Sequence, residues 1–457
     1  MLKEILSALA QPPELLTHVS TVGEGELPSV YAVTDLAVAS ISAAALSVAN
    51  LIAQRQDSVP AVQVDRVSAS RWFARSLQPI GWELPPTWDS VAGDYQTRDG
   101  WIKLHTNAPH HRAAALCALD LSATDTGLTR QRVAQVVHTL KASELEQEII
   151  SQGGCAAEMR STEAWQAHPQ GQAVLSEPLL AIRDYEAGSV RANWSLQLER
   201  PLQGIRVLDL TRILAGPVAT RFLASYGAEV LRIDPLDWDE PVVAPEVTLG
   251  KRRARLDLRS AAGKKTFEIL LRHADVLVHG YRSDALEKLG FGEYRRRELN
   301  PGLVDVSLDA YGWTGPWHTR RGFDSLVQMS SGIAEAGMRI LGKSAPTPLP
   351  VQALDHATGY LLAAAVVRGL ERRVSQGGGS VVRASLARTA AMLNQLSPPR
   401  HRQIEPLREE LLSDYAKTIE STAWGPAYRL RPPYSIKNTR AYWELSAGRL
   451  GDGVAAW

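Results

Sequence analysis

Cysteine is scarce in this chain, which limits both the disulfide bonds and the metal sites that it could contain. Only two cysteines, Cys117 and Cys155, occur among the 457 residues, and they lie far apart in the sequence. No spacing of histidine and cysteine is typical of a zinc site. We therefore expect buried thiols, no metal and a cytoplasmic setting, where thiols stay reduced.

An excess of charge of either sign is also missing. Lysine and arginine number 50 and aspartate and glutamate 49, so the formal net charge is +1. Such a balance gives no global field that would attract the chain to nucleic acid or to an anionic membrane. The N-terminal segment lacks the plan of a signal peptide. The uncharged stretch 36–54 contains serines and an asparagine, which favours a buried helix over a membrane span.

Three common signatures are absent as well: the Gly-x-Gly-x-x-Gly loop, the Walker loop and the Gly-x-Ser-x-Gly elbow. Carboxylates, backbone amides and basic residues remain as the groups that could do chemistry. Segment 204–234 is the most informative part of the sequence. Its apolar run 205–210 is typical of a buried parallel strand. A helix is expected from Ala215 to the stop at Gly227, and a second strand at 229–233. Such a unit points the free amides of the helix N-terminus at a ligand.

The alternation of strands and helices continues through residues 201–400 and predicts an α/β body with a doubly wound, Rossmann-like parallel sheet. Residues 92–200 predict a second, smaller α+β domain, since a tight turn at Asp99-Gly100 joins two strand-like runs. In the larger body the later strands are expected at 254–258, 275–278 and 303–308, and the helices between them at 263–273 and 284–289.

An internal repeat links the two ends of the chain. Asp35 and Asp355 each precede an Ala-rich helix that contains three consecutive alanines, and each helix is followed by a polar loop and a short strand. Duplication explains this shared order better than two unrelated helices would. Residues 1–91 are therefore an N-terminal helical segment and linker that repeats 350–400, and residues 401–457 are interpreted as a C-terminal wrapping tail.

Asp355 is the strongest candidate for a catalytic carboxylate in the sequence. It is expected to be the N-cap of a helix at 357–370, since aspartate is a favoured cap. The helix N-terminus favours an ionised carboxylate, and a nucleophilic carboxylate must be ionised, so capping and catalysis are compatible.

Anion binding has its own candidates, in two groups. Tyr281 and Arg282 follow a strand at the edge where ligands bind in such sheets. The other group could hold phosphates or form a solvated charged edge; its members are the amides after Gly216 and the side chains of Lys251, Arg252, Arg253 and Arg259.

Seven motifs in a fixed order resemble the family III CoA-transferases, which include formyl-CoA and carnitine CoA-transferases. The α-methylacyl-CoA racemases belong to the same superfamily. Residues 92–183 resemble the family's small domain, with Asp99-Gly100-Trp101 as the best mark. The motifs are R-V-L-D-L-T-R-I-L-A-G-P, G-A-E-V-L-R-I-D, G-K-R-R-A-R-L-D-L-R-S, A-D-V-L-V-H-G-Y-R, Y-G-W-T-G-P-W, R-G-F-D-S-L-V-Q-M-S-S-G and L-D-H-A-T-G, within 204–234, 251–259, 275–289, 311–332 and 350–386.

The resemblance implies transfer of coenzyme A between an acyl-CoA donor and a carboxylic acid acceptor, through an aspartyl anhydride and an aspartyl thioester. Coenzyme A would then be part of the substrate, and a homodimer with interlocked chains is expected. Asp355 falls on the family's catalytic aspartate, while its repeat copy Asp35 is expected to be structural. The CoA contacts fall on Leu214, Ala215, Leu256, Asp257, Leu258, Arg259, Tyr281, Arg282, Lys288 and Arg321.

The chain departs from the family in two respects. The small domain precedes the α/β half, so the order of the halves is permuted, and no Gly-rich loop is evident near 85–88. A catalytically inactive CoA-binding protein is therefore one alternative. A racemase-like enzyme is another, but it needs two acid–base groups. Phe323 stands where racemase members carry a histidine, and a phenylalanine cannot carry a proton.

Overall fold

A seven-stranded sheet organises the larger part of the chain, and the computed structural model describes residues 1–122, 124, 128–186 and 194–457. Its strands lie in the order β10-β9-β8-β11-β12-β13-β7. Every neighbouring pair from β10 to β13 is parallel, and β7 is antiparallel to β13. The strands are β7 (Ala181–Asp184), β8 (Arg206–Leu210), β9 (Glu229–Asp234), β10 (Lys251–Arg255), β11 (Val276–His279), β12 (Val304–Asp309) and β13 (Ser380–Ser385).

The order of the parallel strands confirms the predicted doubly wound sheet. The first parallel strand, β8, lies in the middle of the sheet. The next two strands, β9 and β10, lie outward on one side of β8, and β11, β12 and β13 follow on the other side. This is the Rossmann order, in which the winding reverses between the first and the fourth strand. Ligands of such sheets bind outside the carboxyl ends of the strands at that point. The reversal lies here between β8 and β11.

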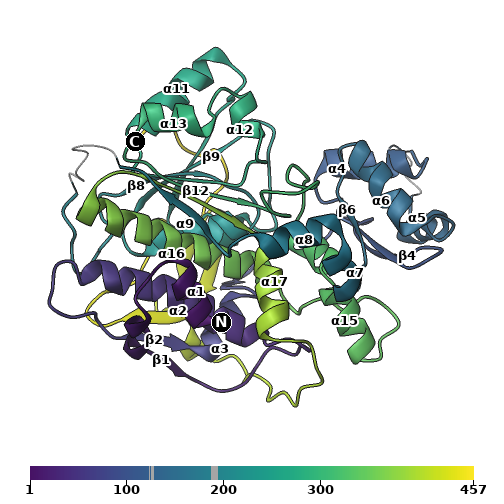
Figure 1. Cartoon of the computed structure of the whole chain (residues 1–457), viewed down its shortest axis with the longest axis horizontal. Helices are drawn as coiled ribbons and strands as arrows, with labels where there is room; N and C mark the ends of the chain where they lie inside the picture. The colour runs from purple at the N-terminus through teal and green to yellow at the C-terminus, as the bar shows by residue number, and fades with distance from the viewer. Residues whose placement is uncertain (123, 125–127, 187–193) are drawn as a thin grey trace.

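Helices cover both faces of the sheet, because neighbouring strand residues point to opposite sides. Val207, Val276 and Val304 share a buried apolar cluster with α9 (Ala215–Ser225) and α16 (Ala353–Gln376). Leu208 and Leu277 belong to a second cluster with α11 (Ala261–Arg272). Figure 1 shows α11 to α13 above the sheet and α9 and α16 below it. The remaining helices of this body are α10 (Ala244–Val247), α12 (Ala285–Lys288), α13 (Glu293–Leu299), α14 (Asp324–Ser330), α15 (Ile333–Ile340) and α17 (Leu386–Leu396).

The smaller α+β lobe projects from one side of the large body (Figure 1). Its antiparallel sheet has the order β4-β5-β6, and its helices bury an apolar core of their own. The predicted turn at Asp99-Gly100 joins its first two strands. The elements are β4 (Gly93–Gln96), β5 (Trp101–Leu104), β6 (Ala156–Glu158), α4 (Pro109–Ala118), α5 (Arg130–Val137) and α6 (Ala142–Ser151).

Part of the segment expected in the small domain belongs instead to the large sheet. Strand β7 pairs with β13 through the register Ser380↔Asp184, although the sequence predicted 92–200 as one small domain. The pairing covers the edge of β13, which would otherwise present unpaired backbone groups. Between the small sheet and β7 lie α7 (Thr162–Ala167) and α8 (Pro169–Ser176).

The two ends of the chain are interwoven. The last strand of the tail pairs with the second strand of the N-terminal segment in the mixed sheet β1-β2-β16, and an antiparallel sheet has the order β14-β15-β3. The elements are α1 (Leu2–Ala8), η1 (Pro13–His18), β1 (Val19–Val22), α2 (Val33–Ile52), β2 (Val62–Asp65), α3 (Arg66–Trp72), β3 (Leu77–Pro79), η2 (Leu412–Asp414), β14 (Glu420–Thr422), β15 (Gly425–Arg429) and β16 (Tyr434–Ile436).

The order helix, strand, helix occurs twice, as the repeat in the sequence predicts. The first copy is α2–β2–α3 and the second is α16–β13–α17. Asp65 and Ser385 end the two strands, and the side chain of each caps the following helix. Helix α2 is long and apolar enough to cross a membrane by length and composition, yet most of its side chains are buried inside the protein, against α16 among others.

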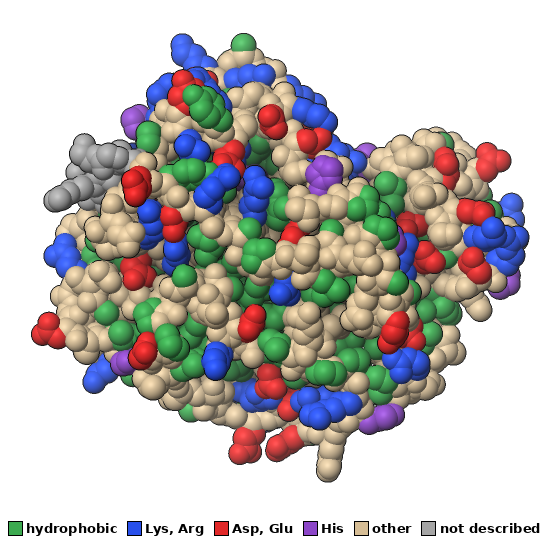
Figure 2. All heavy atoms as spheres, in the orientation of Figure 1, with side chains coloured by type: hydrophobic (Ala, Val, Ile, Leu, Met, Phe, Trp, Pro, Cys, Tyr) green, Lys and Arg blue, Asp and Glu red, His purple; other side chains and the backbone are tan. Residues whose placement is uncertain are grey.

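The face seen in Figure 2 mixes acidic and basic side chains without a continuous patch of one sign. This distribution agrees with the balanced composition of the chain. A local arrangement of groups, rather than a surface-wide field, must therefore select any charged ligand on this face.

Candidate active site

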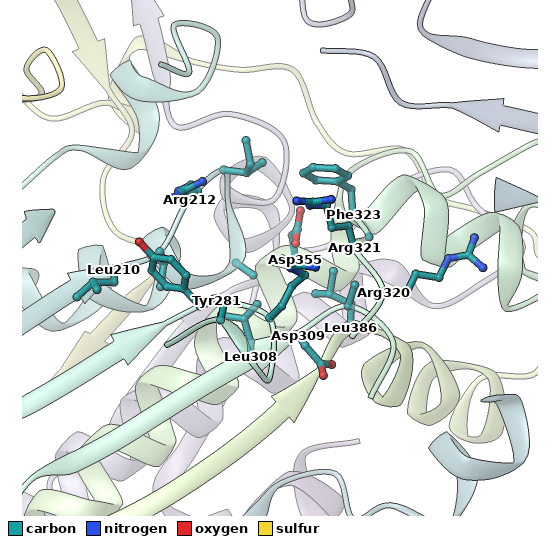
Figure 3. A pocket seen from close by; sticks show the side chains of 18 of the residues that line it. Leu210, Arg212, Tyr281, Leu308, Asp309, Arg320, Arg321, Phe323, Asp355 and Leu386 are labelled. Atoms are coloured by element: carbon teal, nitrogen blue, oxygen red, sulfur yellow. The ribbon is translucent and has the colours of Figure 1, made fainter. Parts of the chain in front are cut away.

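A cavity of about 370 Å³ lies at the point where the winding of the sheet reverses. The carboxyl ends of β8, β11 and β12 form its floor, through residues such as Thr211, Gly280 and Asp309. The small lobe contributes His111. The first turn of α16 contributes Asp355, which is labelled in Figure 3. The cavity therefore lies between the two bodies, at the place where a doubly wound sheet binds its ligands.

Positive potential converges on this cavity from helix ends and from side chains. Helices α4 and α9 begin at residues that line it or adjoin it, and neither is capped by the side chain of its own N-cap residue. Free amides at a helix N-terminus attract anions. Four guanidinium groups line the same space, against the carboxyls of Asp309 and Asp355; they are those of Arg212, Arg282, Arg320 and Arg321.

The turn between β8 and α9 is held in a conformation that few residues adopt. Ile213 has a φ of 62°, in the left-handed region that is unfavourable for a β-branched side chain. Its N–H donates to Glu240 Oε2 at 2.8 Å, and Glu240 is buried. A Cβ atom at Gly216 would collide with the side chain of Thr211, so the turn also requires glycine there. Strain of this kind persists where the surrounding structure holds it, and it clusters at functional sites.

Asp355 occupies the third position of α16, since the helix begins at Ala353 and Gln352 is its N-cap. The expectation that Asp355 itself is the N-cap is therefore wrong. The helix begins at Ala353, about one turn before the predicted start at residue 357, and a carboxylate of another helix accepts a hydrogen bond from one of its first amides. The N–H of Asp355 donates to Asp324 Oδ2 at 2.9 Å.

The protonation state of Asp355 also differs from the expectation. Burial raises the pKa of its carboxyl well above the usual value, and the charge of Asp324 raises it further. Burial likewise raises the pKa of Asp324. Desolvation thus outweighs the helix dipole in the ligand-free protein, and the neutral form of Asp355 is favoured. The carboxyl must lose its proton before it can act as a nucleophile.

The structure brings together about half of the residues predicted to contact CoA or to react. Asp355, Ala215, Tyr281, Arg282 and Arg321 all line the cavity. The others lie outside its lining. Leu214 precedes Ala215 as the N-cap of α9, Leu256, Asp257, Leu258 and Arg259 follow β10 at the same sheet edge two strands away, and Lys288 ends α12, paired with Asp284.

Two side chains of the basic stretch after Gly250, those of Lys251 and Arg253, are not free to bind phosphate. Lys251 is fully buried, and its Nζ lies 3.0 Å from Asp209 Oδ2 and 3.0 Å from the carbonyl oxygen of Pro217. Arg253 pairs with Asp452 of the tail. These side chains are occupied by internal partners, because a buried carboxylate such as Asp209 requires a positive charge beside it.

Three histidines of the small lobe lie at or near the cavity, and the sequence did not predict this. The ring of His105 stacks on that of Phe323 with centroids 3.8 Å apart, and His111 Nε2 lies 3.5 Å from Cys155 Sγ. His110 and His111 both line the cavity. Burial lowers the pKa of His111 to about 3, so its imidazole is neutral. The one local signal was the pair of histidines directly after Pro109, at the start of a helix.

Within the described ranges, no group of three or more His, Cys, Asp or Glu side chains is arranged to hold a metal ion. The buried thiol of Cys155 is also poorly suited to reaction, because burial raises the pKa of that thiol to about 12.

Comparison with known proteins gives a match to one family model. The model of "CoA-transferase family III" matches residues 202–416. An acyl-CoA transferase of Gibberella moniliformis is 28% identical over 74% of this chain and 62% of its own length. A probable fatty acyl-CoA transferase of Mycobacterium tuberculosis is 34% identical over 43% and 54%, and the human succinyl-CoA:glutarate CoA-transferase is 29% identical over 54% and 57%. The chain thus spans about half to three fifths of the length of these relatives.

Solved structures give partial alignments. A CAIB/BAIF family protein from Brucella suis is 24% identical over 50% of this chain and 65% of its own, with a TM-score of 0.40. A Mycobacterium tuberculosis protein is 33% identical over 43% and 57%, with a TM-score of 0.39.

Proposed function

We propose that this chain transfers coenzyme A between an acyl-CoA and a carboxylic acid, since residues 202–416 match the model of "CoA-transferase family III". The observation that carries the proposal is the position of Asp355. Its carboxyl has no hydrogen-bond partner in the described part of the chain, and it lines the same cavity as Tyr281 and Arg282 at the reversal point of the sheet. A reactive carboxyl and the expected CoA crevice therefore share one space.

The proposed reaction exchanges one thioester for another. The Asp355 carboxylate attacks the thioester carbonyl of the donor, the C–S bond breaks, and CoA leaves as a thiolate. The thiolate attacks the aspartyl carbonyl of the resulting mixed anhydride, which releases the donor acid and leaves an aspartyl-CoA thioester. The acceptor carboxylate then forms a second anhydride and frees the thiolate again. Attack of that thiolate on the acceptor's acyl carbon gives the new acyl-CoA and restores Asp355.

The protein's part in this scheme is to hold anions and to keep water out. The N-termini of α4 and α9, with Arg212 and Arg321, line the cavity and suit the phosphates of CoA and the carboxylate of the acceptor. Positive charge near Asp355 favours the ionised form of its carboxyl, which nucleophilic attack requires. Water must be excluded because hydrolysis of the anhydride would waste the donor.

Transfer itself is tested by a screen of acyl-CoA donors against carboxylate acceptors, read by mass spectrometry. We expect at least one pair in which CoA moves from donor to acceptor while free CoA stays low. Hydrolysis alone, or the absence of exchange in a broad panel, contradicts the proposal.

The pH dependence of transfer should respond to Asp324. Activity requires ionised Asp355, whose pKa is raised by burial and by the charge of Asp324, so activity should rise with pH along the acid limb. Asp324→Asn keeps an oxygen that accepts the N–H of Asp355 but removes the negative charge. The pKa of Asp355 should then fall, and the acid limb of the rate profile should move to lower pH. A limb that stays in place, or moves upward, contradicts the assignment.

Arg282 is expected to bind the donor rather than to react. Arg282→Gln should raise the KM for acyl-CoA by about tenfold and leave kcat within about twofold, because it removes a charge-assisted hydrogen bond. Lys265→Gln, on the exposed surface of α11, is the matched control and should change neither constant. Steady-state kinetics with a fixed acceptor measure both. An equal fall of kcat in Arg282→Gln would instead show a role in the chemical step.

A racemase-like activity is the second candidate, because one observation favours it. His111 and Asp355 both line the cavity, so an imidazole and a carboxyl face the same space. Proton removal and return at a carbon need such a pair. Deuterium wash-in at the α-carbon of a 2-methylacyl-CoA, without any carboxylate acceptor, would favour this activity over transfer.

We also propose a homodimer with interlocked chains that works in the cytoplasm. The support for the dimer is the resemblance to the family, and the support for the compartment is the pair of free cysteines, Cys117 and Cys155. Light scattering coupled to gel filtration measures the oligomeric state, and a monomer at micromolar concentration would contradict the dimer.

A further inference from the structure

A second cavity, of about 760 Å³, lies at the start of α2. Helix α2 is the sequence copy of α16, whose first turn opens into the candidate active site. Asp35 holds the third position of α2, as Asp355 does in α16. The first turns of α2 and α3, strand β1 and the segment that follows α17 enclose this cavity. No part of the proposed CoA transfer uses it.

Asp35 differs from Asp355 in a way that rules out the same chemistry. Its carboxylate accepts a hydrogen bond from Arg66 Nη1 at 2.6 Å, and nearly half of its side chain is exposed. A carboxylate held by a guanidinium is a weak nucleophile, because its charge is already neutralised. Asp35 therefore does not give the second cavity a reactive carboxyl like that of Asp355.

Among the described side chains that line the cavity, that of Arg400 is a cation not committed to a carboxylate. Arg66 pairs with Asp35 and Glu26, and Arg402 pairs with Glu26. Arg400 also lines the cavity, and its guanidinium has no hydrogen-bond or ion-pair partner among the described residues. The N-terminus of the 20-residue helix α2 adds partial positive charge at the same place. The uncommitted charge is suited to one negative group.

Ser42 supplies an independent sign of a ligand. It lines the cavity and is 1% exposed, yet its hydroxyl has no hydrogen-bond partner in the described part of the chain. Its neighbours Ser40 and Ser47 instead bond to backbone carbonyls of Leu36 and Ala43, in the usual manner of helical serines. A buried hydroxyl without a partner is costly. An acceptor atom of a bound molecule would remove that cost.

We propose that this cavity binds an aliphatic carboxylate of medium chain length. The carboxylate accepts hydrogen bonds from the Ser42 hydroxyl and the Arg400 guanidinium. The hydrocarbon chain packs on the apolar lining, which includes Leu2, Val38 and Leu396. The volume lies in the range of small-molecule sites. The proposal concerns a site apart from the active one, and it stands or falls independently of CoA transfer.

Titration calorimetry of the full chain with octanoate, below the concentration at which octanoate forms micelles, tests the site. We expect saturable one-to-one binding, weakened about tenfold by Ser42→Ala and about tenfold by Arg400→Gln. Arg282→Gln, in the other cavity, should bind octanoate as the wild type does. Octylamine and 1-octanol should not bind, since they lack the negative group.

Stability measurements separate loss of a ligand contact from loss of fold. Ser42→Ala should unfold at a temperature no lower than the wild type, because it removes an unpaired buried hydroxyl. Arg400→Gln changes an exposed side chain and should leave the unfolding temperature unchanged. The proposal is overturned if octanoate does not saturate, if both variants bind it like the wild type, or if Arg282→Gln abolishes the binding.

Discussion

Replacing Asp355 by asparagine is expected to lower the rate of CoA transfer by roughly 10³-fold or more. An amide cannot attack the thioester carbonyl as a carboxylate does, whereas its size and shape are nearly the same. The side chain makes no ion pair within the described residues, and its backbone N–H keeps its bond to Asp324. Loss of activity would therefore report on chemistry and not on folding. Exchange between a labelled acid and an acyl-CoA measures the rate.

Glu144→Gln is the matched control for this variant. Glu144 holds the third position of α6, as Asp355 does in α16, but its side chain is 66% exposed and pairs with Lys141 on the surface. We expect full activity from it, since exposed pairs contribute little. Wild-type protein incubated with donor alone should also carry a hydroxylamine-sensitive adduct on Asp355. Full transfer by Asp355→Asn would exclude this residue as the nucleophile, and CoA binding without any transfer by the wild type would favour a binding protein.

The parallel sheet could be predicted because its strands carry their signal locally. Buried strands of a doubly wound sheet read as short apolar runs between turn residues, and 205–210 and 303–308 are such runs. Strand β7, by contrast, pairs with β13, which lies far along the chain; Ala181, for example, lies opposite Arg383. The local sequence of β7 does not specify that pairing, so the boundary of the small domain was misplaced.

The active site could be predicted only as far as its residues share sequence motifs. Tyr281 and Arg282 follow a strand whose carboxyl end lies at the reversal point, so their place followed from the sheet. The position of His111 could not be predicted, because the small lobe reaches the cavity through tertiary packing alone. The raised pKa of Asp355 was missed for the same reason, since burial is a property of the folded structure and not of the helix end.

Lys251→Met is expected to have the largest effect on stability of any change considered, lowering the free energy of unfolding by about 3–5 kcal/mol. Lys251 and Asp209 are both fully buried, and their charged atoms lie 3.0 Å apart. Removal of the ammonium leaves the carboxylate of Asp209 inside the core, where it keeps the hydrogen bonds from the N–H and hydroxyl of Thr211 and the hydroxyl of Thr220 but loses the cation beside it. Urea unfolding followed by circular dichroism measures the change, and Lys265→Gln should stay within about 0.5 kcal/mol of the wild type.

The double variant Lys251→Met with Asp209→Leu distinguishes the loss of an attraction from the exposure of an unpaired charge. If the cost comes from the unpaired Asp209 carboxylate, removing both charges should restore much of the lost stability, because well-packed apolar residues often replace a buried ion pair without loss. If the two single changes simply add, the pair does not act as a unit. Restoration would show that Lys251 neutralises Asp209 beneath the cavity floor. It would also explain why this lysine is not available to bind phosphate.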